Sequence, residues 1–388
     1  MSINKIAFAH DVPGLLSQPM NTSTKRVFVA ATRQNDGKTT TSLGLYGAFR
    51  TLGHDVSYIK PVAQRIVKTA GSEAEIDEDT FLLNSVYDVK IPVEAMSPVA
   101  VDGQFTRNYL NHPEELKPRI KDAICRAFDR AAYEKDIIII EGSGHAGVGS
   151  VFDTSNADNA AMLGAKAIIV SSGGIGRPVD EIALNKALFD RKGVECVGAV
   201  LNKIIPEKAE EIRSYAGSAL KRLGIPLLGV LPLEKSLARP NLSQIADEIG
   251  GEWLVHTTDA RSQRVQKCVI GAMSAQRIPD YVISGTLLIM PGDREDLLFS
   301  LIAGASAVAL PQLAGIVLTN GLRPNARIIE MLTQFGLPVV ATTKECFATT
   351  TKINSMIVKT QPADRDKIST IEEMIRKNLD LAHLLAAL

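Results

Sequence analysis

A Gly-Lys-Thr triplet at residues 37–39 is the clearest group in this sequence that could do chemistry on a phosphate. It follows an apolar, β-branched run at residues 26–31 and opens a helical pattern over residues 38–52. A strand-to-helix turn of this kind directs backbone N–H groups and a helix N-terminus at an anion. Lys38 would neutralise the β- and γ-phosphates of a nucleotide, and the Thr39 hydroxyl would complete a magnesium shell. We therefore expect ATP and Mg²⁺ as ligands.

The loop around this triplet supplies most of the expected nucleotide contacts. The strict phosphate-loop pattern has a glycine five residues before Gly37, where this chain has Thr32. Arg33 could contact phosphate or could equally be a surface residue. The expected cofactor-binding residues of the loop are Arg33, Asn35, Asp36, Gly37, Lys38, Thr39 and Thr40.

Strand and helix patterns alternate through the first two-thirds of the chain. The apolar run at residues 137–140 has no polar alternation, which is typical of a parallel strand covered on both faces. The pattern predicts an α/β fold with a doubly wound parallel sheet, whose ligands bind beyond the C-terminal ends of the strands. Its expected strands are residues 26–31, 56–60, 136–141, 167–171, 194–201 and 227–230.

The chain is long enough for two domains. Residues 1–24 lack a clear period and include a second methionine, Met20, so they are interpreted as a loose extension. The nucleotide domain is expected at residues 25–250. The glycine pair at 250–251 and the polar run at 257–263 mark the boundary, and a smaller α/β domain is expected at 262–388. Its expected strands are residues 286–290, 307–310, 315–318 and 338–341.

The composition favours small-molecule partners in the cytoplasm. Lys plus Arg and Asp plus Glu both total 43, so no basic surface for nucleic acid or an anionic membrane is indicated. The four cysteines show no Cys-x-x-Cys pairing, which is typical of reduced thiols. No apolar run approaches the roughly 20 residues that cross a bilayer.

Three further motifs make the chain resemble dethiobiotin synthetase and cobyrinic acid a,c-diamide synthases, and more closely the N-terminal part of large phosphate acetyltransferases. They are Tyr-Ile-Lys-Pro at 58–61, Glu-Gly-Ser-Gly-His at 141–145 and Val-Leu-Asn-Lys at 200–203. This resemblance to a P-loop NTPase family implies catalytic roles for Lys38, Lys60 and Glu141. It also implies nucleotide contacts by Asn202 and by Pro232, which ends a segment that closes the base pocket.

The resemblance also implies the metal and substrate residues. Magnesium would be held by Thr39, Glu141 and a second carboxylate, assigned to Asp77, although Glu78 and Asp79 stay open as alternatives. The expected substrate residues are Gly142, Ser143, His145, Gly173 and Gly174. Ser143 and His145 replace small residues of the family motif, which argues against dethiobiotin synthesis itself. Dimerisation is a further family expectation.

The C-terminal module resembles the DRTGG domain, through residues 271–274, 292–296 and 319–324. Asn320 stands where that motif usually has glycine, and asparagine tolerates positive φ. Asp293, Arg294 and Arg323 are interpreted either as a site for a small anion or as structural ion pairs.

Two functions therefore follow from the sequence. The first is a ligase-type enzyme that transfers the γ-phosphoryl group of ATP to a carboxyl or carbamate oxygen, or to water. The alternative is a regulatory nucleotide sensor without acetyltransferase activity. A ParA-like partitioning ATPase ranks third, because such proteins carry lysine where this chain has Arg33.

Overall fold

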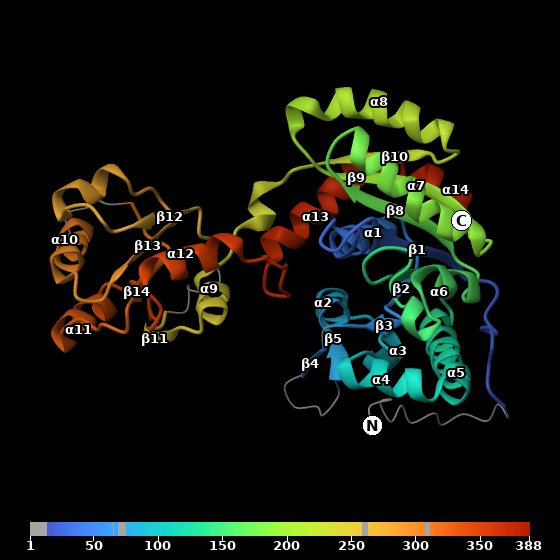
Figure 1. Cartoon of the computed structure of the whole chain (residues 1–388). Coiled ribbons are helices and arrows are strands. Elements are labelled where there is room, and N and C mark those ends of the chain that lie inside the picture. Colours follow the sequence, from blue (N-terminus) through green and yellow to red (C-terminus); the bar gives the residue numbers. More distant parts are fainter. Residues whose placement is uncertain (1–13, 65, 69–74, 258–262, 307–310) are drawn as a thin grey trace. The chain divides into compact units, whose positions relative to one another are not determined.

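The computed structural model describes residues 14–64, 66–68, 75–257, 263–306 and 311–388. The chain divides into two compact units, residues 1–233 with 365–388 and residues 234–364 (Figure 1). The second unit is therefore inserted between two parts of the first. These bounds differ from the expected ones at residues 250 and 262, and the last 24 residues belong to the first unit instead of the second.

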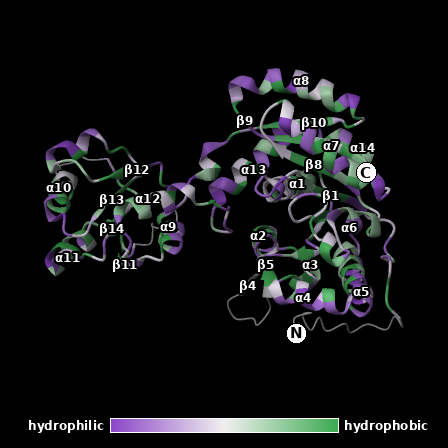
Figure 2. Cartoon of the chain, viewed as in Figure 1, coloured by the Kyte–Doolittle hydropathy of each residue, from purple (hydrophilic) through white to green (hydrophobic). Residues whose placement is uncertain are grey.

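The first unit is built on a six-stranded sheet whose strands all run parallel, in the order β10-β9-β8-β1-β7-β2. The predicted doubly wound sheet is thus confirmed. Most of its residues are buried, and hydrophobic colours mark its strands in Figure 2. The strands are β1 (Lys25–Ala31), β2 (Val56–Ile59), β7 (Ile137–Glu141), β8 (Lys166–Ser172), β9 (Cys196–Ile204) and β10 (Leu227–Pro232).

Helices cover both faces of this sheet. One hydrophobic cluster joins alternate strand residues to α5 (Pro113–Ala132), α6 (Asn156–Met162), α7 (Gly176–Arg191) and α8 (Ala209–Arg222). Helices α1 (Lys38–Thr51) and α13 (Arg365–Asn378) pack on each other, and each also contacts strands of the sheet. The smaller elements of the unit are β3 (Val62–Ala63), β4 (Ile66–Lys68), β5 (Glu75–Asp77), α2 (Glu78–Tyr87), α3 (Val93–Met96), β6 (Val99–Ala100), α4 (Gly103–Asn111) and α14 (Leu381–Ala387).

Both terminal segments are held on this unit. Residues 14–24, expected as a loose extension, lie along α5, where the Leu16 amide donates to Asp122 at 2.7 Å and the Thr24 hydroxyl donates to the Ala132 carbonyl at 2.9 Å. At the other end, the Asp380 amide donates to the Leu228 carbonyl at 2.8 Å. The C-terminal segment therefore covers the outer edge of β10, which would otherwise present unpaired backbone groups.

The second unit is a five-stranded sheet in the order β11-β15-β14-β13-β12, in which only β11 runs antiparallel to its neighbour. The expected strand at residues 307–310 lies outside the described residues. The strands are β11 (Glu252–Val255), β12 (Lys267–Ile270), β13 (Thr286–Pro291), β14 (Gly315–Thr319) and β15 (Val339–Ala341), and the helices are α9 (Leu242–Ile249), α10 (Glu295–Ser306), α11 (Ala326–Gln334) and α12 (Cys346–Ser355).

None of the described helices combines the length and apolarity that a membrane span needs. All four cysteines are free thiols.

Candidate functional site

The loop between β1 and α1 has the backbone of a tight anion-binding turn. Asn35 and Gly37 both adopt positive φ, at 67° and 108°. A Cβ at Gly37 would lie 2.0 Å from the Asn202 side-chain nitrogen, so only glycine fits beneath that residue. The first turn of α1 then carries Lys38, Thr39 and Thr40, with Lys38 buried.

Several residues that were expected to contact the nucleotide form hydrogen bonds within the phosphate loop or to it. Asp36 accepts hydrogen bonds from the hydroxyls of Thr32 at 2.7 Å and Ser172 at 2.6 Å, so its carboxylate faces the end of β8. The Asn202 amide donates to the Asp36 carbonyl at 2.9 Å, and Lys203 donates to the Asn35 carbonyl at 2.6 Å. The ends of β8 and β9 thereby fix the loop from one side.

Glu141 is held between two hydroxyl groups at the end of β7. The Thr39 hydroxyl donates to one carboxylate oxygen at 2.8 Å, and the Tyr58 hydroxyl donates to the other at 3.1 Å. Burial raises the pKa of Glu141 to about 7, reinforced by the Asp79 carboxylate and opposed by Lys60. Two of the three expected magnesium ligands, Thr39 and Glu141, are therefore in direct contact.

Lys60 is locked between two carboxylates. Its ammonium group donates to Asp77 at 2.8 Å and also forms an ion pair with Asp79. Burial lowers the pKa of Lys60, but the neighbouring Asp79 and Asp77 charges outweigh it and raise that pKa overall. Asp77 also accepts from the Asp79 amide at 2.9 Å and so caps α2. Asp77 and Asp79, which sequence left as alternatives, thus both touch Lys60.

Lys38 lies in the same charged group. Burial lowers its pKa, Glu141 raises it, and the like charge of Lys60 lowers it further. An incoming phosphate would bring negative charge close to the buried Lys38 ammonium group.

The expected substrate loop after β7 is fixed by Asn156, a residue that sequence analysis missed. Its side-chain amide donates to the carbonyls of Ser143 at 2.8 Å and His145 at 2.7 Å, and its oxygen accepts from the Ser143 amide at 3.1 Å. A Cβ at Gly142 would lie 2.7 Å from that oxygen. An asparagine at the start of a helix gives no local sign of such a role.

His145 and the other expected contact residues are more exposed. The His145 ring accepts from the Gly147 amide at 3.2 Å and is exposed. Gly173, with φ of 100°, and Gly174 form an open turn after β8. Pro232 is half-buried at the end of β10.

Arg33 is half-exposed and pairs with Glu181, which also holds Arg177 at 3.1 Å. This carboxylate therefore holds Arg33 against α7, beside Arg177 of the same helix.

The donor set fits a magnesium ion held partly by a nucleotide. The second oxygen of Asp77 is buried and has no hydrogen-bond partner among the described residues. No group of three or more His, Cys, Asp and Glu side chains with metal-binding geometry occurs in the described ranges. Magnesium commonly takes one or two carboxylates together with phosphate oxygens and water, so Thr39, Glu141 and Asp77 would suffice beside a bound phosphate.

In the second unit the singled-out charges form structural contacts. Arg294 donates to the carbonyls of Gly271 at 3.0 Å and Met273 at 3.1 Å, and pairs with Asp296 at 2.8 Å. Arg323 pairs with Glu252, so the two arginines do not share a partner.

The backbone of these turns is equally constrained. Asn320 adopts a φ of 64°, as expected for a residue at a glycine position. A Cβ at Gly292 would lie 1.8 Å from the Leu322 carbonyl oxygen, so the two turns touch through their backbones.

The parallel sheet, its phosphate loop and the adjoining charged group define a P-loop NTPase-type domain, into which a second α/β unit is inserted. The AAA_26 family model, described as an AAA domain, matches residues 25–241, and the DRTGG domain model matches residues 244–356. The first match covers more than half of the chain, which therefore belongs to the AAA_26 family and carries a DRTGG domain.

Curated relatives of this chain include phosphate acetyltransferases. That of Nitratidesulfovibrio vulgaris is 27% identical over 367 residues, covering 92% of this chain and 51% of the relative. That of Pseudomonas aeruginosa is 28% identical over 376 residues, with the same two shares, 92% and 51%. The chain thus spans about half the length of the curated relatives it matches.

Solved structures that are similar to parts of this chain share little sequence identity with it. The septum site-determining protein MinD from Pyrococcus horikoshii, complexed with Mg-ADP, is 16% identical with a TM-score of 0.35, covering 55% of this chain and 83% of that one. The CBS and DRTGG domains of a Clostridium perfringens pyrophosphatase, complexed with diadenosine tetraphosphate, are 20% identical with a TM-score of 0.27, covering 46% of this chain and 86% of that one.

Proposed function

We propose that the first unit binds ATP with Mg²⁺ and transfers the γ-phosphoryl group to a carboxyl or carbamate oxygen, or to water. The observation that carries this proposal is the contact between Thr39 and Glu141 at 2.8 Å, next to the buried Lys38 and Lys60. Phosphoryl transfer is catalysed mainly by positioning and by charge stabilisation, and this group offers both.

Each residue has a distinct part in the proposed reaction. The backbone N–H groups of residues 37–39 and the Lys38 ammonium bind the β- and γ-phosphates. Thr39, Glu141 and Asp77 hold Mg²⁺, which supplies neutralisation of phosphate charge when bound. Lys60 stabilises the charge that develops on the transferred group, once phosphate competes with Asp77 and Asp79 for its ammonium.

The acceptor would enter beside the turn at residues 142–145. Asn156 holds the carbonyls of Ser143 and His145, so the backbone of that turn is preorganised for an acceptor. We further propose that the chain acts in the cytoplasm as a homodimer.

Magnesium-dependent ADP release tests the proposal. The purified chain is assayed alone and with pooled carboxylate and amine metabolites, beside Lys38→Ala and Lys60→Ala. Lys186→Ala is the matched control, because it also removes one positive charge but at a position outside the site, where Lys186 pairs with Asp190 within α7 at 2.6 Å. The Lys38→Ala protein loses a charged hydrogen bond to phosphate. Its affinity for ATP should therefore be about 10- to 100-fold lower than that of the unmodified chain.

Lys60→Ala separates binding from chemistry. It should lower the rate of ADP release more than it weakens ATP binding, because its contact forms in the transition state. Equal loss in the Lys186→Ala control, or unchanged ADP release in Lys38→Ala, would refute the assignment.

A regulatory nucleotide sensor is the second candidate. One support is that this chain covers only about half the length of its curated relatives. The other is that Asp77 and Asp79 already neutralise the charge of Lys60, the residue that a phosphoryl-transfer enzyme would need for catalysis. Tight ATP binding without metabolite-stimulated turnover would favour the sensor over the enzyme.

A further inference from the structure

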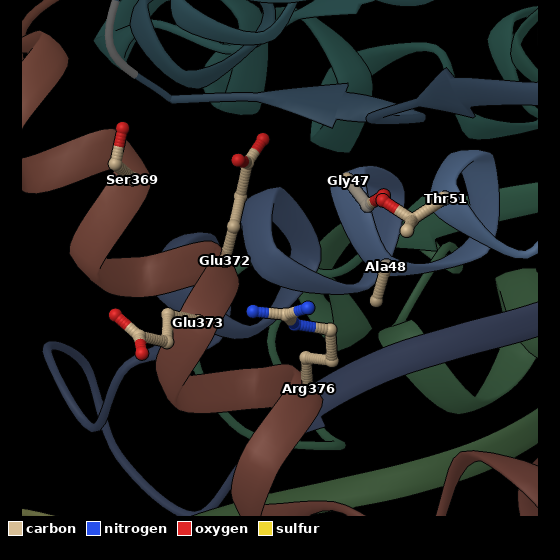
Figure 3. Close-up of a pocket in the computed structure, with 7 residues that line it drawn as sticks. All are labelled: Gly47, Ala48, Thr51, Ser369, Glu372, Glu373 and Arg376. Carbon is tan, nitrogen blue, oxygen red and sulfur yellow. The ribbon is translucent and has the colours of Figure 1, made fainter.

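Helix α13 lies against the helix that begins at the phosphate loop. Two glycines of α1 allow this close approach, as Figure 3 shows for Gly47 beside Glu372. A Cβ at Gly44 would lie 2.2 Å from a side-chain carbon of Ile375, and one at Gly47 would lie 2.5 Å from a Glu372 oxygen. Displacement of α1 towards α13 would therefore displace α13 as well.

A second helix links the same site to α13. Helix α2 begins directly after Asp77, whose carboxylate contacts Lys60, and it ends at Tyr87. The Tyr87 hydroxyl lies 2.7 Å from a Glu372 oxygen and 2.9 Å from the Leu43 carbonyl oxygen of α1. The Tyr87 ring also stacks on Tyr46 at a centroid distance of 4.4 Å. Tyr87 thus joins α1, α2 and α13 at one point.

The charges at the start of α2 make this connection sensitive to ligand. Without phosphate, the Lys60 ammonium is bound by Asp77 and Asp79. A bound γ-phosphate attracts that ammonium, and a magnesium ion attracts the carboxylates. Both ligands therefore weaken the contacts that hold the first turn of α2.

The far end of α13 is continuous with the second unit. Asp364, the last residue of that unit, is buried and pairs with Arg264 at 2.7 Å. Arg365 begins α13 directly after it. Helix α13 therefore follows the second unit directly in the chain, and its later turns contact α1 and α2.

We propose that α13 relays the nucleotide state of the first unit to the DRTGG unit, through the hydrogen bond between Tyr87 and Glu372. This regulation rests on the proposed nucleotide site. Binding of Mg-ATP draws Lys60 away from α2, weakens the Tyr87 contact and loosens α13. A polar pocket of about 350 Å³, lined on the α13 side by Ser369, Glu372, Glu373 and Arg376, gives these side chains room to rearrange (Figure 3).

Amide hydrogen exchange of the full chain tests the relay. Calorimetry first establishes whether Mg-ATP binds, and exchange is then compared in peptides covering residues 365–378 with and without it. Exchange should become about three- to tenfold faster in the bound protein, the range expected for loss of one net hydrogen bond. Tyr87→Phe, which keeps the ring but lacks the hydroxyl, should exchange at the faster rate without ligand and respond no further.

Thermodynamic reciprocity gives a second readout. Tyr87→Phe should bind Mg-ATP more tightly by the same factor of about three to ten, because the ligand no longer has to break the contact. Lys377→Ala is the matched control, since Lys377 is exposed, lies in α13 outside the lining of this pocket, and pairs with Glu373 of the same helix at 2.5 Å. It should behave as the unmodified chain in both measurements.

The outcomes separate the relay from the nucleotide site. If Mg-ATP binds while exchange in residues 365–378 is unchanged or slower, the relay is refuted and the site stands. A Tyr87→Phe protein that responds like the unmodified chain also refutes it. Absence of Mg-ATP binding refutes the proposed nucleotide site, and the relay with it.

Discussion

Alanine substitution at two helical glycines should change stability in opposite directions. Gly44 of α1 and Gly217 of α8 both lie within helices, where replacing glycine by alanine gains about 0.5–1 kcal/mol. At Gly217 the new methyl group would meet only a Leu227 carbon at 3.5 Å, an ordinary contact distance. Gly217→Ala should therefore stabilise the first unit by about 0.5–1 kcal/mol.

At Gly44 the packing cost exceeds this gain. The new methyl group would lie 2.2 Å and 2.9 Å from two carbons of Ile375 and 3.2 Å from the Ile371 carbonyl oxygen. Both isoleucines are fully buried, so neither has free space to move into. Overpacking costs about 1–3 kcal/mol, and an approach of 2.2 Å to a buried side chain calls for the upper part of that range, about 2–3 kcal/mol. After the gain of about 0.5–1 kcal/mol from replacing glycine, Gly44→Ala should be destabilising by about 1–2.5 kcal/mol.

Urea denaturation can assign the change to one unit. Far-UV circular dichroism reports both units, whereas the single tryptophan, Trp253, lies in β11 of the second unit. Gly44→Ala should lower the midpoint of the transition seen by circular dichroism and leave the Trp253 transition in place. If Gly44→Ala stabilises the chain as Gly217→Ala does, the close packing of α1 on α13 is refuted.

Four other substitutions test individual polar contacts. Burial raises the pKa of Glu141 to about 7 in the folded chain, so folding favours the protonated form of this residue. The stability that this form contributes is lost as pH rises from about 4.5 to about 7. Glu141→Gln should abolish this decrease in stability, on the order of 3 kcal/mol, when urea titrations at pH 5 and pH 8 are compared. Tyr58→Phe should destabilise the first unit by about 1–3 kcal/mol above pH 7, because the Glu141 carboxylate loses a buried donor, and an unchanged urea midpoint would contradict the contact. Lysine in place of Arg294 cannot reach two carbonyls and Asp296 together, so Arg294→Lys should destabilise the second unit by about 1–2 kcal/mol, seen as a lower urea midpoint of the Trp253 transition. Arg323 is exposed, so Arg323→Lys should change the stability of that unit by less than about 0.5 kcal/mol.

The central sheet could be predicted because its signal is local. The run at residues 137–140 is apolar on both faces, and β7 spans Ile137–Glu141, within one residue of its expected range. The other five expected strands of that sheet overlap β1, β2, β8, β9 and β10. Parallel strands covered by helices carry this pattern in their own residues, so no knowledge of distant segments is needed.

The domain bounds depend on contacts between distant residues. Residues 365–388 follow the DRTGG match in sequence, which favours grouping them with it, but Ile375 packs on Gly44 of α1. Nothing in either segment alone identifies the other. The same reason explains why the hydrogen bonds of residues 14–24 to α5 escaped sequence analysis.

Site residues could be predicted where a sequence motif determines their position. They could not be predicted where their role depends on hydrogen bonds to side chains or carbonyls from distant parts of the chain. The motif placed Lys38 and Thr39 at the start of α1 and Glu141 at the end of β7, and the structure brings Thr39 and Glu141 together. It did not indicate that Asp36 turns towards Ser172 or that Asn156 holds the next turn. These choices depend on which hydroxyl and carbonyl groups lie within reach in the folded chain.

The insertion of the DRTGG unit limits how this protein can be divided. A truncation after residue 250, the expected domain boundary, would remove α13 and α14 and expose the glycine face of α1 and the free edge of β10. Such a fragment should aggregate, since an uncovered strand edge pairs with other chains. Excising residues 234–364 and joining Leu233 to Arg365 through a flexible linker would keep the whole first unit, and is the more promising way to obtain it as an autonomous folding domain.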